Sequence, residues 1–161
     1  MTTGERSLRA GRVIGLTAPH RRARWVPPLM AIAVVMLIGG LWEGLVYLGF
    51  ALPAGQSGLH AGHGPLMVLG FLGLLIGLER AVALGHAWAY LAPAGAALGG
   101  LAIVVDAPNA VGQALMTFGG AVLVAIFVAV HRIQASLHNA VLASGAVCWV
   151  VAGALWLAGW D

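Results

Sequence analysis

Five apolar runs, each close to the roughly 20 residues that a helix needs to cross a lipid bilayer, dominate this sequence. We predict membrane spans at 26–50, 64–84, 88–105, 110–130 and 139–160. Only 8% of the 161 residues are charged, so polar side chains are too few to cover a water-facing surface. The chain is therefore predicted to be an all-α integral membrane bundle of five transmembrane helices.

The arginines divide the chain into a basic tail and a membrane domain. Six of its eight basic residues precede the first span, and we predict residues 1–25 as a cytoplasmic tail and residues 26–161 as one transmembrane domain. Positive charge near span ends stays in the cytoplasm, and Arg80 and Arg132 agree with that orientation. We expect a multi-pass protein of the inner or plasma membrane, with its N-terminus cytoplasmic and its C-terminus outside. The tail then contacts anionic lipid rather than nucleic acid.

The most informative stretch enters the second span from the outside and reads HAGHGPLMVLGF over residues 60–71. Pro65 fits the first turn of a helix, which places His63 at the helix mouth. At 100° per residue, the residues that share the face of His63 are nearly bare of bulk: Met67, Gly70, Leu74 and Gly77. A flat macrocycle or another helix backbone could approach such a face.

Small-residue spacing supports the second of these two interpretations. Glycines four residues apart are typical of close helix packing in membranes. The chain has three such pairs, Gly40 with Gly44, Gly73 with Gly77, and Gly95 with Gly99. Two histidines beside the bare face favour a metal centre instead.

The segment from His63 to Phe71 resembles the second transmembrane helix of heme-copper oxidase catalytic subunits, where a His-Gly-x-x-Met type sequence supplies an axial ligand to the low-spin heme. It is also similar to the His-x-His segment of the NnrS heme- and copper-containing membrane proteins. The resemblance implies heme b or copper as cofactor, with His63 as an axial ligand near the outer face. It implies that His60 is either a further ligand or a residue that contacts a ligand. The oxidase subunit has more spans and further histidines, so oxygen reduction is not expected here.

His60 and His63 come from one helix edge and cannot clamp opposite faces of one porphyrin. A second axial ligand would come from Met67, Met116, water or another subunit, and a homodimer with two copies of His63 is one such arrangement. Histidine ligation suits electron transfer. The first prediction is thus a small membrane b-type heme protein for electron transfer or ligand sensing, with Met67 and Gly70 on its heme-binding face.

Glu43 lies too deep in the first span to reach the outer interface easily. Glu43 could be a protonated carboxyl that is hydrogen-bonded to a neighbouring helix. As a functional alternative, we expect it to hold His60 or His63 by a hydrogen bond, as carboxylates next to metal ligands do. A second hypothesis makes Glu43, His60 and His63 a two-histidine, one-carboxylate site for copper, iron or zinc. A third hypothesis is a non-catalytic subunit of a larger membrane complex, packed through its glycine faces.

Two further groups of polar residues lie toward the cytoplasmic side. His86, His131 and His138 could form a second site or be ordinary loop residues. Glu79 and Arg80 point about 100° apart on a helix, so we expect each to contact a different neighbouring helix or the interface rather than the other. The sequence contains no nucleotide loop or nucleophile triad, and no catalytic residue is predicted.

Overall fold

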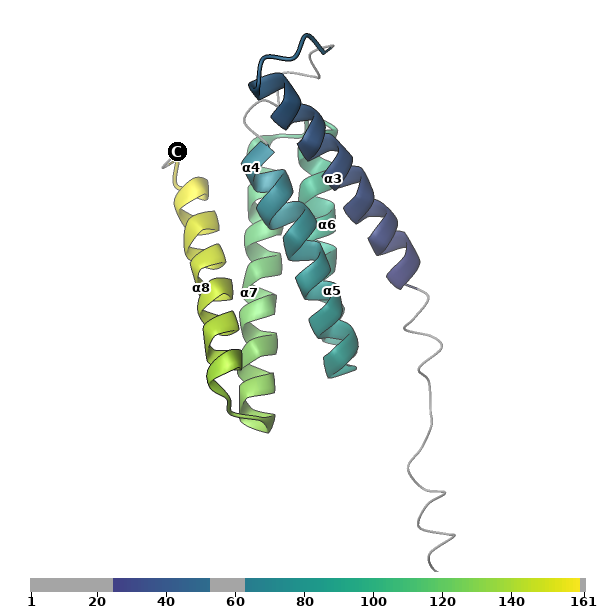
Figure 1. Ribbon diagram of the computed structural model, residues 1–161. Helices are drawn as coiled ribbons and strands as arrows, with labels where there is room; N and C mark the ends of the chain where they lie inside the picture. The colour runs from purple at the N-terminus through teal and green to yellow at the C-terminus, as the bar shows by residue number, and fades with distance from the viewer. Residues whose placement is uncertain (1–24, 53–62, 160–161) are drawn as a thin grey trace, which may run out of the picture.

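The computed structural model describes residues 25–52 and 63–159, and these residues are helical apart from short connections (Figure 1). Five of their helices are long and apolar enough to cross a membrane. They are α3 (Val26–Tyr47), a composite helix over His63–Leu84, a second composite over Ala87–Val104, α7 (Asn109–Ile133) and α8 (Leu137–Leu157). The predicted five-helix membrane bundle is confirmed, and the protein is a multi-pass membrane protein. The basic tail lies outside the described residues.

The second span is not a uniform α-helix. It begins with α4 (His63–Pro65), continues as the π-helix η1 (Leu66–Leu72) and ends with α5 (Gly73–Leu84). The apolar pattern did not predict the π-helical turns. Such turns are rare and occur frequently at functional sites, and here they begin three residues after the predicted site residue His63.

A tight turn joins the second span to the third. Gly85 ends α5 with a left-handed φ of 69°, which a glycine adopts without strain. His86 is extended and leads into the 3₁₀ turn η2 (Ala87–Tyr90) and then α6 (Leu91–Val104). At the other end of α6, the turn before α7 places Asp106 at a φ of 56°.

Helices α6 and α7 form the centre of the bundle, and α3 and α8 lie on opposite flanks (Figure 1). The central pair is close because its glycines face backbone atoms. A Cβ added to Gly95 would lie 2.9 Å from the Cα of Gly119, and one added to Gly99 would lie 2.8 Å from the carbonyl oxygen of Gly112. The spacing of Gly95 and Gly99 is therefore a helix-packing motif.

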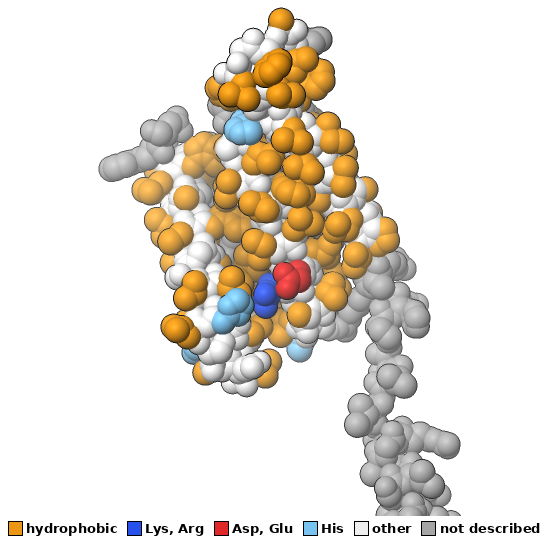
Figure 2. All heavy atoms as spheres, in the orientation of Figure 1, with side chains coloured by type: hydrophobic (Ala, Val, Ile, Leu, Met, Phe, Trp, Pro, Cys, Tyr) orange, Lys and Arg blue, Asp and Glu red, His pale blue; other side chains and the backbone are white. Residues whose placement is uncertain are grey.

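Neighbouring helices also cover the bare face of the second span. A Cβ added to Gly70 would lie 3.1 Å from the sulfur of Met36, and one added to Gly77 would lie 3.1 Å from the nitrogen of Pro93. Leu74, between them, is fully buried. This face was predicted to admit either a flat macrocycle or another helix, and along residues 70–77 it is other helices that approach it. On the outside of the bundle, apolar side chains are spread over the whole visible face, and charged side chains are few (Figure 2).

Candidate functional site

His63 begins the second span and is held by the first. Its Nδ1 lies 2.7 Å from the carbonyl oxygen of Gly40 on α3. Because a carbonyl can only accept, Nδ1 carries the hydrogen and donates it. In the neutral ring this leaves the lone pair of Nε2 available as a metal ligand.

The surface of α3 under this ring lacks side chains. A Cβ added to Gly44 would lie 3.0 Å from the Cε1 of His63, so the ring rests almost on the helix backbone. The ring of Tyr47, one turn further, lies 6.2 Å from the imidazole centroid to centroid, tilted by 59°. The sequence did not single out Tyr47, and the only signal for this side of the site was the spacing of Gly40 and Gly44.

His63 also borders a cavity of about 430 Å³ at the end of α3. This volume falls in the range of roughly 300–1,000 Å³ that is typical of small-molecule and cofactor sites. The other lining residues are Leu41, Gly44, Leu45, Tyr47 and Leu48. The site thus combines one oriented imidazole with a mostly apolar wall.

Glu43 is fully buried on the same helix, between the two glycines that contact His63. The Nδ1 of His63 donates to the Gly40 carbonyl, so the backbone, rather than a carboxylate, orients this ring at Nδ1. His60 lies outside the described residues. The expected contact between Glu43 and one of the two histidines therefore stays a prediction.

Met67 and Gly70 lie deeper in the bundle than His63. The thioether of Met67 packs against Gly40, and Gly70 faces Met36 and Met116. Neither Met67 nor Gly70 lines the cavity beside His63. The structure thus gives both a packing role, and their part in cofactor binding stays a prediction.

The opposite end of the bundle carries the remaining histidines. His86, His131 and His138 are exposed, and no three His, Cys, Asp or Glu side chains within residues 25–52 and 63–159 are arranged to hold a metal ion. The expectation that Glu79 and Arg80 do not pair is wrong, because Arg80 Nη2 lies 3.3 Å from Glu79 Oε1. Both side chains are long enough to bend toward each other despite the angle between their Cβ atoms.

The fold and this site define a class, the small multi-pass helical membrane proteins with a histidine at the mouth of a transmembrane helix. Within that class the chain belongs to the family described as a domain of unknown function, DUF8744, whose model matches residues 24–161. No curated protein and no solved structure matches the chain.

Proposed function

We propose that this protein is a small b-type heme protein of the membrane, for electron transfer or ligand sensing, with Nε2 of His63 as an axial ligand. The observation that carries the proposal is the 2.7 Å hydrogen bond from His63 Nδ1 to the Gly40 carbonyl. Metal-ligating histidines almost always donate their other N–H to a carboxylate, a backbone carbonyl or water. His63 is oriented in the same way.

Heme fits these surroundings better than a bare ion does. A porphyrin supplies four nitrogens to its iron, so the protein needs to supply only one or two axial ligands. The cavity beside His63 has an apolar wall of leucines, and such a wall limits solvent access and tunes the reduction potential of a heme. Leu41, Leu45 and Leu48 would contact the macrocycle, and the iron would supply one-electron chemistry.

The second axial position separates electron transfer from ligand sensing. Met67 and Met116 pack against glycines inside the bundle. We therefore place the other ligand in a second copy of the chain, in a homodimer, or leave the position open. Two protein ligands suit electron transfer, and an open position suits binding of a small gaseous ligand.

Optical spectra of the full chain, expressed with sufficient heme and purified in mild detergent, test the proposal. We expect a Soret band that shifts on reduction and is lost in His63→Ala, because the axial ligand is gone. His86→Ala is the matched control, since His86 Nδ1 also bonds a backbone carbonyl, that of Leu84 at 2.8 Å, but at the other end of the bundle. A heme-supplied wild type without a Soret band, or His63→Ala with an unchanged one, would refute the heme function.

A carbon monoxide difference spectrum of the same protein then assigns the second position. Rapid binding indicates one open site and ligand sensing. Resistance to carbon monoxide indicates two protein ligands, and the oligomeric state of the purified protein shows whether a second copy provides one of them.

The complete burial of Glu43 next to the glycines that contact His63 favours a second candidate. In this candidate Glu43, His60 and His63 hold a single copper, iron or zinc ion. Elemental analysis distinguishes it from the first. Stoichiometric metal without a Soret band, reduced in Glu43→Gln by roughly 10- to 100-fold in affinity, would support this ion site instead of heme.

We also propose that the N-terminus is cytoplasmic and the C-terminus external, in the inner or plasma membrane. Arg80 and Arg132 lie toward the ends of α5 and α7, two helices that run in the same direction, so both belong to one side of the membrane (Figure 1). The positive-inside rule assigns that side to the cytoplasm. A reporter that is active only outside the cytoplasm should be active when it is fused after Asp161. Activity there of a reporter that works only in the cytoplasm would reverse the assignment.

A further inference from the structure

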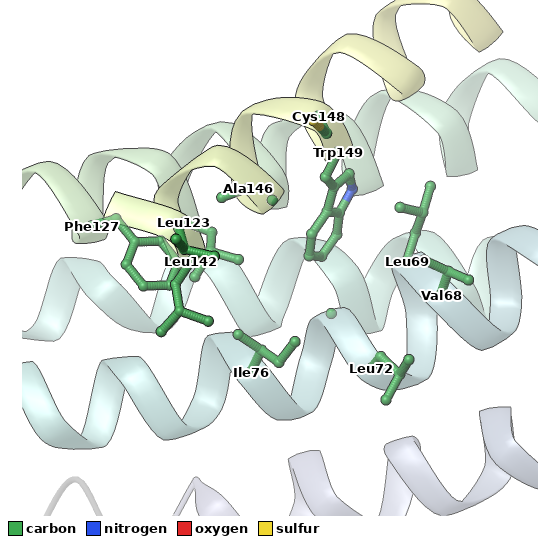
Figure 3. A pocket seen from close by; sticks show the side chains of 13 residues that line it. Val68, Leu69, Leu72, Ile76, Leu123, Phe127, Leu142, Ala146, Cys148 and Trp149 are labelled. Atoms are coloured by element: carbon green, nitrogen blue, oxygen red, sulfur yellow. The ribbon is translucent and has the colours of Figure 1, made fainter. Parts of the chain in front are cut away.

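A second cavity, of about 410 Å³, lies between the second span and α8, away from His63 (Figure 3). Its walls come from η1 and α5 on one side and α8 on the other, with α7 behind them. The lining is apolar and includes Val68, Leu72, Ile76, Phe127, Leu142 and Trp149. We refer to this cavity as the α5–α8 groove.

Trp149 lines the α5–α8 groove and spans part of its width. Its indole ring reaches from α8 across to Gly73 of α5 and lies against Gly120 of α7, and Figure 3 shows it pointing between the two walls. Beside it, a Cβ added to Gly145 would meet no atom within 4 Å. Helix α8 therefore packs on α7 and leaves an apolar space toward α5. In a bilayer we expect an apolar molecule to fill this space.

One end of the groove carries one arginine and two histidines. The groove residues nearest to that end are Ile76, Phe127 and Leu142, one from each of the three helices. One helical turn further in the same direction, and on the same helix faces, stand Arg80, His131 and His138. The Cζ of Arg80 lies 5.7 Å from the centre of the Phe127 ring, which places its guanidinium over a groove residue.

Arg80 keeps hydrogen-bonding capacity at this end. Its Nη2 contacts Glu79, a side chain that is 68% exposed, at 3.3 Å. Its Nε is buried and has no hydrogen-bond partner among the residues that the structure describes. A buried donor without a partner is costly. The Arg80 side chain is 22% exposed, and a guanidinium binds phosphate oxygens through several N–H donors at once.

From this charge complementarity we propose that the α5–α8 groove binds one anionic phospholipid. An acyl chain lies along the apolar wall from Phe127 toward Val68, and the phosphate interacts with Arg80, His131 and His138. Basic pockets between transmembrane helices recognise anionic headgroups in this way. The site is independent of the proposed heme site.

Native mass spectrometry of the full chain tests the site directly. The protein is stripped of lipid in detergent and offered equal amounts of phosphatidylglycerol and phosphatidylcholine. We expect one phosphatidylglycerol per chain, retained in preference, and a loss of roughly 5- to 10-fold in that retention in Arg80→Gln. Arg132→Gln is the matched control, because Arg132 is exposed at the same end but lies five residues after Phe127 and thus off the groove face.

A second variant separates the groove from the surface charge. Gly145→Leu places a side chain in the open space beside Trp149, so it should exclude the acyl chain while the helical circular dichroism and its melting temperature stay unchanged. Cys148, the single cysteine of the chain, lines the groove and is exposed. Bound phosphatidylglycerol should slow its reaction with an apolar maleimide, and Arg80→Gln should remove that protection. Equal retention of the two lipids, or retention unaffected by both Arg80→Gln and Gly145→Leu, would overturn the proposal.

Discussion

Two glycine pairs with the same spacing have different neighbours in this bundle. Gly95 and Gly99 of α6 face backbone atoms of α7, at 2.9 and 2.8 Å from their hypothetical Cβ positions, and Gly99 also faces the Cγ of Met116 at 2.6 Å. Gly40 and Gly44 of α3 face the side chains of Met67 and His63 instead. The spacing creates room in both places, but α7 backbone atoms contact both glycines of the first pair, whereas side chains that can move fill the second.

This difference separates packing from a site. A backbone that meets a backbone cannot shift without moving a whole helix, so the α6–α7 contact can only be structural. An imidazole that lies on a helix can rotate, accept a metal and exchange its partners. The Gly40 carbonyl accepts the hydrogen bond of His63 at 2.7 Å. The α3 contact is therefore the one of the two that can take part in ligand binding. The following predictions test this difference.

The largest effect should follow from Gly95→Ala. The added methyl would lie 2.9 Å from both the Cα of Gly119 and the carbonyl oxygen of Leu115, and neither atom can move independently of α7. We expect a loss of about 1–3 kcal/mol in the free energy of unfolding, the usual cost of overpacking, measured by denaturation in detergent. Gly39→Ala is the control, since its methyl would meet no atom within 4 Å. Equal stability of the two variants would mean that α6 and α7 are not in backbone contact.

Gly44→Ala should have a smaller effect on stability and a selective effect on His63. The new methyl would lie 3.0 Å from the Cε1 of His63, and the ring can turn away while α3 stays in place. Turning weakens the hydrogen bond to Gly40, which is worth about 0.5–1.5 kcal/mol, so heme retention should fall by up to about tenfold. The ¹⁵N shift of His63 Nδ1 reports the hydrogen bond without any cofactor. An unchanged shift would show that the ring does not rest on α3 at Gly44.

The fold was predictable from the sequence because span length and hydropathy are local properties. The predicted range 64–84 differs by one residue from the observed span His63–Leu84. The partner of His63 was not predictable, because every residue carries a carbonyl and Gly40 lies 23 positions away. The spacing of Gly40 and Gly44 predicted only that another part of the chain could approach the backbone of the first span.

The contact between Glu79 and Arg80 shows a different limit. Helix geometry gives the direction of each Cβ, and from that angle the two residues should not meet. The charged groups sit several bonds beyond Cβ and meet at 3.3 Å. The groove beside Phe127 was equally hidden, because it depends on where Trp149 of α8 lands against Gly73.

The smallest effect should come from Met67→Leu. The thioether of Met67 packs against Gly40, and leucine has nearly the same volume, so the cost should stay below about 1.5 kcal/mol. Because Met67 does not line the cavity beside His63, the Soret band of the heme-loaded protein should keep its position in both oxidation states. Gly40, which Met67 contacts, lies one turn from Gly44 on the same face of α3, so the heme retention of Met67→Leu is compared with that of Gly44→Ala. A shifted band in Met67→Leu, together with new carbon monoxide binding, would show that the thioether leaves Gly40 and ligates the iron. Met67 and His63, the two side chains that pack on the α3 glycines, would then both belong to the heme site.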